Sequence, residues 1–156
     1  MTSKKRVVLI TGAESGIGKS TSKIFLDNGY KVICTYLKNN NNKNTKDIEY
    51  HRIDITKSKD WENLALYIKK KFKKIDVLVN SAGVRLSGNL ETTSMSDWSY
   101  HLNNNVTGTF LACKYILPFL KKAKNSSIIN VASINSIRGA KNMLAYATSK
   151  SAVISF

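Results

Sequence analysis

Short apolar runs alternate with longer amphipathic segments along most of this 156-residue chain. Short runs rich in β-branched residues are typical of strands that are buried on both faces of a sheet. Longer segments with apolar residues every three or four positions are typical of helices that bury one stripe. The pattern predicts strands at 6–10, 31–36, 48–55, 75–79 and 127–132. It predicts helices from Ile17 to the stop signal Asn28-Gly29, at 59–72 and at 98–123, and a last helix that contains Tyr146 and Lys150.

The order of these elements defines the expected fold class. Strands that alternate with helices favour a parallel α/β sheet with helices on both faces, joined by right-handed crossovers. We find no internal repeat and no domain boundary, so 1–156 is expected to form one domain. The polar tract 39–44 is expected to be a solvated loop with room for a short helix, and 84–97 a loop with a helical piece near its end. Pro118 should end or kink the helix at 98–123.

A glycine-rich turn joins the first strand to the first helix. Gly12, Gly16 and Gly18 have the spacing G-x3-G-x-G instead of G-x-G-x-x-G. Glycines let the backbone turn sharply and approach a pyrophosphate, whose charge the helix N-terminus can receive. The location between a strand and a helix favours a dinucleotide site. The alternative is a tight turn that binds no ligand.

The residues that end the second strand bear on which dinucleotide would bind. A carboxylate at this place binds the ribose 2′-hydroxyl of NAD, but this chain has Tyr36, followed by Leu37 and Lys38. The missing acid and the nearby lysine favour the 2′-phosphate of NADP, with NAD as the alternative. The glycine turn contributes Glu14 and Ser15 and no basic residue.

Tyr146 and Lys150 are four positions apart near the end of the chain, and Ser133 lies thirteen positions before Tyr146. On one helix, residues at i and i+4 share a face. An ammonium beside a phenol favours the phenolate, which makes the phenol a usable proton donor and acceptor. The alternative is that a tyrosine and a lysine at this spacing share a helix by chance.

Taken together and in this order, the motifs resemble those of the short-chain dehydrogenase/reductase family. The residues that carry the resemblance are Thr11-Gly12-x3-Gly16-Ile17-Gly18, Asp54-Ile55-Thr56, Asn80-Ser81-Ala82-Gly83, Asn105, Ser133 and Tyr146-x3-Lys150. The resemblance runs from the first strand almost to the last residue. It implies a Rossmann-type doubly wound parallel sheet and an NAD(P)-dependent oxidoreductase. Ser81 is a mild departure, because the family usually has Asn there.

The resemblance implies a role for each of four residues. Tyr146 would be the general acid/base that exchanges a proton with the substrate oxygen. Ser133 would hydrogen-bond the same oxygen and stabilise developing charge. Lys150 would favour the phenolate and hold the nicotinamide ribose. Asn105 would hold a water that links Lys150 to solvent.

The resemblance also implies a cofactor site that extends over several strands. Asp54 and Ile55 would contact adenine, and the segment after the fourth strand would line the cofactor channel. The residues expected to bind cofactor are Thr11, Gly12, Ser15, Gly16, Ile17, Gly18, Tyr36, Lys38, Asp54, Ile55, Asn80, Ala82, Gly83, Tyr146 and Lys150. The expected cofactor is NADP, with NAD as the alternative, and no metal is expected.

The chain stops at Phe156, six residues after Lys150. Family members continue with the rest of that helix, two more strands, another helix and a substrate lid. The resemblance therefore implies that the C-terminal strands are missing from this chain and that it is an N-terminal portion, truncated after the Tyr-Lys helix begins. We expect the 156-residue chain alone to be poorly stable or inactive.

The formal net charge of +15 comes mostly from lysine, including the runs 69–71 and 73–74. Such runs are usually a solvated face of a helix. The alternative is attraction to an anion, such as a phosphate-bearing cofactor, an acidic carrier protein or nucleic acid. No nucleic-acid motif accompanies the charge, so nucleic acid is not an expected partner.

Several other polar residues are expected to have no chemical role. Cys34 and Cys113 fall in apolar segments and are expected to be buried, reduced thiols. His51 and His101 have no partner pattern and are read as non-catalytic. Asn103 and Asn104 are expected to be exposed.

The expected reaction transfers a hydride between the nicotinamide and a carbonyl/alcohol pair. The first substrate hypothesis is a 3-oxoacyl group on an acyl carrier protein, whose acidity would suit a basic surface. A sugar, polyol or steroid alcohol is the alternative, as is a non-catalytic nucleotide-binding fragment. No apolar signal region and no run of membrane-spanning length is present, so we expect a cytoplasmic protein without a membrane partner. By resemblance, a full-length version is expected to form a homodimer or homotetramer.

Overall fold

The computed structural model describes residues 5–38 and 43–156, which form a sheet of five parallel strands. The strands are β1 (Val7–Ile10), β2 (Lys31–Tyr36), β3 (Ile48–Arg52), β4 (Val77–Asn80) and β5 (Ser127–Asn130). Their order is β3-β2-β1-β4-β5, so the chain builds outward from β1 first on one side and then on the other. This order confirms the predicted doubly wound fold. Residues 39–42 of the loop predicted at 39–44 lie outside the described residues.

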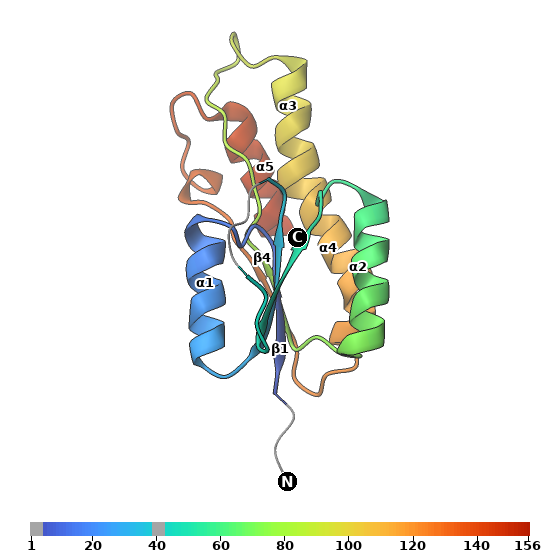
Figure 1. The fold of residues 1–156 in the computed structure, drawn as a ribbon. Coiled ribbons are helices and arrows are strands. Elements are labelled where there is room, and N and C mark those ends of the chain that lie inside the picture. Colours follow the sequence, from blue (N-terminus) through green and yellow to red (C-terminus); the bar gives the residue numbers. More distant parts are fainter. Residues whose placement is uncertain (1–4, 39–42) are drawn as a thin grey trace.

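Helices cover both faces of the sheet. They are α1 (Gly16–Asp27), α2 (Ser58–Lys71), α3 (Met95–His101), α4 (Gly108–Leu120) and α5 (Leu144–Ser155), with a π-helical turn η1 (Leu102–Thr107) and a 3₁₀ turn η2 (Ile134–Ser136). Figure 1 shows α1 on one face, α2 and α4 on the other, and α3 and α5 toward the end of the sheet away from the N-terminus. Within the described residues, no helix has both the length and the apolarity that crossing a membrane requires.

Each face of the sheet carries its own apolar cluster. Successive side chains of a strand point to opposite faces, so Val7 and Leu9 of β1 join one cluster and Val8 and Ile10 the other. The first cluster lies under α2 and α4 and contains the fully buried Trp61. The second lies under α1. The prediction that the first strand is buried on both faces is therefore confirmed.

β3 ends at Arg52, three residues before its predicted end at 55. Beyond Arg52, the backbone of residues 54–55 bonds to side chains in the first part of α2. The Asp54 backbone N–H donates to the Asp60 carboxylate at 2.7 Å. The Trp61 indole N–H donates to the Ile55 carbonyl at 2.8 Å. These bonds replace the pairing that a longer strand would make.

β5, unlike β1, is not buried on both faces. Its Ile128 and Ile129 are 42% and 45% exposed. In the described part of the chain, β5 pairs with β4 and forms one edge of the sheet. An apolar run therefore predicted the strand correctly but not its place at the edge.

α1 packs through the small residues Gly18 and Ser22 and the half-buried Phe25 and Leu26, and not through its isoleucines. Ile17 and Ile24 are 61% and 62% exposed, whereas Gly18 and Ser22 are buried. A Cβ at Gly18 would lie 2.2 Å from the carbonyl oxygen of Gly12. Because the helix approaches the turn so closely on its glycine side, the isoleucines face outward.

The helix predicted at 98–123 is a run of three consecutive segments. It begins earlier, at Met95, with Ser94 as the N-cap, continues through η1 and ends with α4 at Leu120. The Ser94 hydroxyl accepts a hydrogen bond from the Asp97 N–H at 3.0 Å, which satisfies one free donor of the first turn. Pro118 lies in the last turn, so the helix ends soon after the proline, as predicted.

The π turn changes which residues face the core after it. A regular helix at 98–123 would place Phe110 and Leu117 on its apolar stripe, but they are 45% and 42% exposed. Ile116 and Phe119 are buried in their place. A π turn contains more residues than an α turn, so a 3.6-residue pattern carried through it points to the wrong face.

The cysteines and most of the lysine runs behave as predicted. Cys34 and Cys113 are free and buried. Burial raises the pKa of Cys34 to about 12 and also raises the pKa of Cys113. Lys69, Lys70 and Lys73 are exposed.

Lys71 pairs with a buried carboxylate instead of standing free in solvent. Its Nζ lies 2.6 Å from Oε1 of Glu49, a β3 residue that is 8% exposed. The Tyr67 hydroxyl also donates to the Glu49 carboxylate. Burial alone would raise the pKa of Glu49, but the hydrogen bonds from Lys71 and Tyr67 outweigh it, so the pKa lies below its ordinary value of 4.5.

The lowered pKa of Glu49 predicts a pH-dependent contribution to stability. The charged form is favoured in the folded state, so the contribution is present above the ordinary value of 4.5 and is lost as the pH falls through the folded pKa. We expect Glu49→Gln to lower the free energy of unfolding at about pH 7 and to lose most of this effect at about pH 3. Urea unfolding at both pH values measures it.

Glu62→Gln is the matched control, because its exposed carboxylate pairs with Lys59 on the surface. Exposed pairs contribute little. An equal difference between wild type and Glu49→Gln at the two pH values would contradict the role given to Glu49.

Candidate functional site

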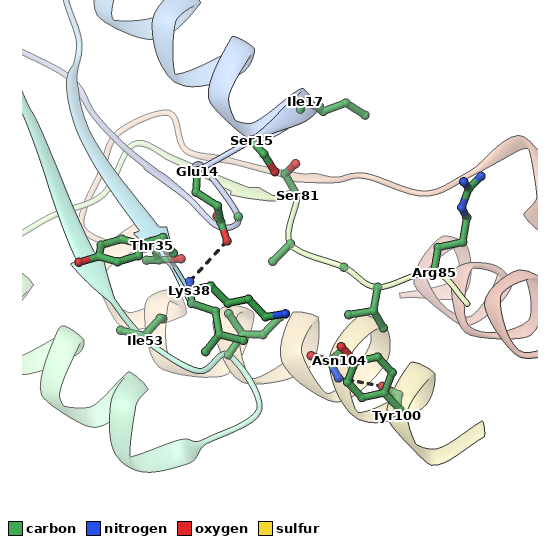
Figure 2. A pocket seen from close by; sticks show the side chains of 18 residues that line it. Glu14, Ser15, Ile17, Thr35, Lys38, Ile53, Ser81, Arg85, Tyr100 and Asn104 are labelled. Atoms are coloured by element: carbon green, nitrogen blue, oxygen red, sulfur yellow. Dashed lines mark hydrogen bonds between the residues drawn. The ribbon is translucent and has the colours of Figure 1, made fainter. Parts of the chain in front are cut away.

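A cavity of about 850 Å³ opens at the carboxyl ends of β1, β2 and β4. Ligands of open parallel α/β sheets bind at this edge, where the strand order reverses. Figure 2 shows side chains from the glycine turn, the end of β2, the segment after β4 and the start of η1 around it. The lining residues are Gly12, Glu14, Ser15, Gly16, Ile17, Thr35, Tyr36, Leu37, Lys38, Ile53, Ile55, Ser81, Ala82, Gly83, Val84, Arg85, Tyr100 and Asn104.

The glycine turn forms one wall of the cavity by a close approach of two backbone segments. Gly12 has φ +65°, and a Cβ there would lie 2.7 Å from the Ala82 Cα. The Thr11 hydroxyl oxygen accepts hydrogen bonds from the backbone N–H groups of Ser81 and Ala82 at 3.1 and 3.0 Å. The turn after β1 and the segment after β4 are therefore fixed to each other.

The start of α1 offers unused donors to this wall. Ser15 is the N-cap, but its side chain makes no capping hydrogen bond. Gly16, at φ +51°, has no atom within 4 Å of the position of a Cβ. Backbone N–H groups at the first turn of a helix attract phosphate, so the turn suits a pyrophosphate.

A buried polar cluster lies behind Gly83. The Asn105 side chain, 1% exposed, accepts a hydrogen bond from the Val84 N–H at 2.8 Å and donates to the Val84 carbonyl at 3.0 Å and the Ser149 hydroxyl at 2.8 Å. Lys150 is 6% exposed, and its Nζ donates to the Val131 carbonyl at 2.6 Å. Burial lowers the pKa of Lys150. A Cβ on Gly83 would lie 3.0 Å from Asn105 Oδ1 and 3.5 Å from Lys150 Nζ.

Ser133 and Tyr146 lie on the two elements that flank this cluster. Ser133 is the N-cap of η2, where its hydroxyl accepts from the Asn135 N–H at 3.2 Å. Tyr146 is half-buried in the first part of α5. The Ser151 hydroxyl donates to the Ser136 carbonyl at 3.0 Å, which joins α5 to η2.

The cavity brings together most, but not all, of the residues expected to bind cofactor. Those that line it are Gly12, Ser15, Gly16, Ile17, Tyr36, Lys38, Ile55, Ala82 and Gly83, whereas Thr11, Gly18, Asp54, Asn80, Tyr146 and Lys150 do not. Thr11 and Gly18 lie behind the wall. The Thr11 hydroxyl accepts the Ser81 N–H, and Gly18 lies against the backbone of Gly12. The Asp54 carboxylate accepts hydrogen bonds from Thr56, and the Asn80 amide donates to the Asn130 side chain at 2.8 Å.

Nine lining residues were not among the residues that the sequence predicted to bind cofactor. Asn104, expected to be exposed, is half-buried and lines the cavity, because the π turn rotates it toward β4. The others are Glu14, Thr35, Leu37, Ile53, Ser81, Val84, Arg85 and Tyr100. Proximity to the two motifs could have indicated Glu14, inside the glycine turn, and Val84 and Arg85, directly after Gly83. The sequence contains no signal for Tyr100.

His101 has no partner pattern in the sequence, yet both of its ring nitrogens are engaged. The ring is 1% exposed. Nδ1 donates to the Asp97 carbonyl at 2.7 Å, and Nε2 accepts from the Leu86 N–H at 2.9 Å. The ring also meets the Tyr146 ring edge to face at 6.4 Å between centroids. His101 thus holds the segment after β4 and contacts α5.

The fold, the glycine wall and the buried lysine define a nucleotide-binding α/β protein, and the family follows from sequence. The sequence pattern of the short chain dehydrogenase family matches residues 6–156. The match includes nearly the whole chain, so the chain belongs to this family. The resemblance inferred from the motifs is confirmed.

Curated relatives act on different substrates. The chain is 33% identical over 148 residues to the 3-ketodihydrosphingosine reductase of Bacteroides thetaiotaomicron, covering 95% of this chain and 54% of that protein. It is 33% identical over 157 residues to the 3-oxoacyl-acyl-carrier-protein reductase FabG of Thermotoga maritima, covering 96% and 64%. The chain therefore spans about half to two thirds of the length of these relatives.

Solved structures share the fold closely. The ligand-free aldohexose dehydrogenase of Thermoplasma acidophilum has a TM-score of 0.90 at 33% identity, covering 97% of this chain and 58% of that one. ElxO with bound NADP has a TM-score of 0.87 at 32% identity, covering 97% and 65%. A short chain dehydrogenase of Leptospira borgpetersenii with bound NAD+ has a TM-score of 0.90 at 26% identity, covering 98% and 63%.

The hydrogen bonds of His101 predict a structural role that can be measured. His101→Leu replaces the imidazole with an apolar side chain of similar size and leaves the Leu86 N–H without its acceptor. This hydrogen bond is part-buried, and the loss of a typical hydrogen bond costs about 0.5–1.5 kcal/mol. We expect the urea midpoint of unfolding to fall accordingly.

Asn103→Ala, an exposed change in the neighbouring π turn, serves as the control and should leave the midpoint unchanged. If His101→Leu unfolded at the same urea concentration as the wild type, the two ring contacts would contribute nothing and this role would be wrong.

Proposed function

We propose that the protein is an NAD(P)-dependent oxidoreductase that interconverts a carbonyl and an alcohol, with 1–156 as one NAD(P)-binding domain. The observation that carries the proposal is the buried Lys150 behind Gly83, next to a cavity with a glycine wall. Burial of a lysine ammonium costs free energy unless the ammonium has a full set of partners. A buried lysine beside a cavity is therefore a candidate functional residue. The single hydrogen bond to Val131 leaves donors of the ammonium for a ligand.

The cavity residues fit the nucleotide. The close approach of Gly12 to Ala82 leaves a smooth backbone wall, and the N-terminus of α1 would receive the pyrophosphate. Tyr36, Ile53 and Ile55 line the part of the cavity that would hold the adenosine. Lys38 supports NADP, with NAD as the alternative. The bound nicotinamide would supply or accept the hydride.

The chain's own residues would handle the proton and the oxygen. Tyr146 donates a proton to the carbonyl oxygen in reduction and removes it from the alcohol in oxidation. Ser133 donates a hydrogen bond to the same oxygen and stabilises its negative charge. Both lie beside the buried cluster, on elements that the Ser151–Ser136 hydrogen bond holds together.

Lys150 and Asn105 would support this proton transfer from behind. The ammonium of Lys150 favours the phenolate of Tyr146 and holds the ribose hydroxyls of the nicotinamide half. Asn105 is fixed by Val84 and Ser149. This rigid amide would hold a water through which protons pass between Lys150 and solvent.

For the substrate, we propose a 3-oxoacyl group on an acyl carrier protein. The support is the similarity to FabG and a net charge of +15, which suits an acidic carrier. The similarity to an aldohexose dehydrogenase supports a sugar as the alternative. The free, buried thiols of Cys34 and Cys113 agree with a reducing compartment, so we propose the cytoplasm as the location.

We further propose that the protein forms a homodimer through α4 and α5. Phe110 and Leu117 of α4 and Ile154 of α5 are exposed, and Phe110 meets the exposed Phe156 at 6.4 Å between ring centroids. Exposed apolar groups gathered over neighbouring helices mark interaction sites.

Phe110→Glu should therefore shift the protein from dimer to monomer, because a buried, unpaired carboxylate opposes association. Light scattering after gel filtration measures the mass. Leu66→Glu, at a 65% exposed position of α2, is the control and should leave the mass unchanged. An unchanged mass for Phe110→Glu would exclude this face as the interface.

The proposed proton transfer predicts a specific defect in Tyr146→Phe. Without the phenolic proton, turnover of a 3-oxoacyl substrate or of any carbonyl in a panel by a full-length version should fall about 100-fold to 10,000-fold. Binding of NADPH and NADH should remain, since the change removes one hydroxyl. The readouts are nicotinamide absorbance for turnover and calorimetry for binding.

Tyr30→Phe is the matched control, because Tyr30 packs against Phe25 beneath α1, away from the cavity. Its turnover should equal that of the wild type. Undiminished turnover in Tyr146→Phe would remove the mechanism proposed here.

A further inference from the structure

Glu14 places a carboxylate in the cavity beside the end of β2. One oxygen, Oε1, accepts a hydrogen bond from the Leu37 N–H at 3.4 Å. The other, Oε2, is buried and accepts no hydrogen bond from the described residues. Figure 2 shows the side chain reaching from the glycine turn toward the chain that follows β2.

A buried carboxylate oxygen without a donor is costly. Oε2 has no donor among the described residues, so the carboxylate of Glu14, which lines the cavity, gains one when its side chain turns toward a ligand there. Lys38 lines the same cavity, yet no ion pair joins it to Glu14 among the described residues. The Glu14 carboxylate and the Lys38 ammonium would therefore act on a ligand in this cavity as two separate groups, an acceptor and a cation.

The location of these two groups defines the part of the ligand that they would touch. The adenosine ribose of a dinucleotide lies at the end of the second strand, where a carboxylate binds its hydroxyls. Tyr36 supplies no carboxylate at that place. Glu14 supplies one from the neighbouring turn, since its carboxylate already touches the backbone of Leu37.

We infer that Glu14 is a cofactor-selecting residue that accepts a hydrogen bond from the ribose hydroxyls and disfavours a 2′-phosphate. The inference rests on the proposed NAD(P)-dependent function. A 2′-hydroxyl donates to a carboxylate, whereas a phosphate has only acceptors and negative charge to offer. Lys38 has the opposite effect, because its ammonium attracts the phosphate. The two side chains compete, and the chain therefore binds both NADH and NADPH with a small preference.

The experiment compares the affinities of NADH and NADPH by calorimetry, without a substrate. For the wild type, we expect the two dissociation constants to lie within about tenfold of each other. Glu14→Gln should tighten NADPH and weaken NADH, changing their ratio by about tenfold or more. Lys38→Gln should change the ratio in the opposite direction.

Glu14→Gln separates selection from a structural role. Glutamine keeps an oxygen that accepts the Leu37 N–H, so the turn stays in place. A purely structural effect would change both affinities alike and leave their ratio unaltered. Glu91→Gln, an exposed change outside the cavity, is the matched control and should alter neither affinity.

The outcomes distinguish the inference from the proposed function. If the wild type binds both nucleotides and the ratio does not change in Glu14→Gln, the inference is wrong and the proposed function stands. If the wild type binds neither nucleotide, both are wrong. A ratio that changes toward NADPH in Glu14→Gln and toward NADH in Lys38→Gln supports the inference.

Discussion

The contact between the turn after β1 and the segment after β4 is the constraint on which the site depends. Gly12 lies so close to Ala82 that no side chain fits between them. The Thr11 hydroxyl fixes the two segments by accepting the N–H groups of Ser81 and Ala82. Because this contact fixes Ala82, it also fixes Gly83, the residue that separates the cavity from the buried lysine. A change in it would move the cavity wall together with the buried cluster of Asn105 and Lys150 behind Gly83.

A second constraint, the π turn, connects the cavity to α5. Asn105 lies inside this turn, and its amide is shared between Val84 and Ser149. An amide can accept and donate at once, so one buried side chain orients both the segment after β4 and the helix that carries Tyr146. The same turn rotates Asn104 into the cavity wall. The π turn thus directs the side chains of Asn104 and Asn105 to places that a regular α-helix would not give them.

The sequence predicts what depends on neighbours along the chain, and it misses what depends on packing. β1, β2, the glycine turn and the Tyr146–Lys150 helix were predictable because short patterns and known turn chemistry determine them. The outward direction of Ile17 was not, because it follows from the contact of Gly18 with Gly12. Asn104 could not be predicted, since a π turn has no sequence period. Glu14 appeared unhelpful for NADP in the sequence, and only its contact with Leu37 shows where its carboxylate lies.

The net charge of +15 and the single Glu14 carboxylate act on different properties of a nucleotide. Both dinucleotides are anions, so a basic surface attracts both and raises their rates of encounter alike. Screening reduces that attraction beyond about 8–10 Å at ordinary salt, which leaves little power to distinguish one extra phosphate. Selectivity requires a difference in affinity, and a group that penalises the wrong ligand supplies it most directly. The Glu14 carboxylate that we propose as an acceptor beside the ribose would be such a group. On this proposal the contacts at the 2′-position, and not the abundance of lysine, determine the choice of cofactor.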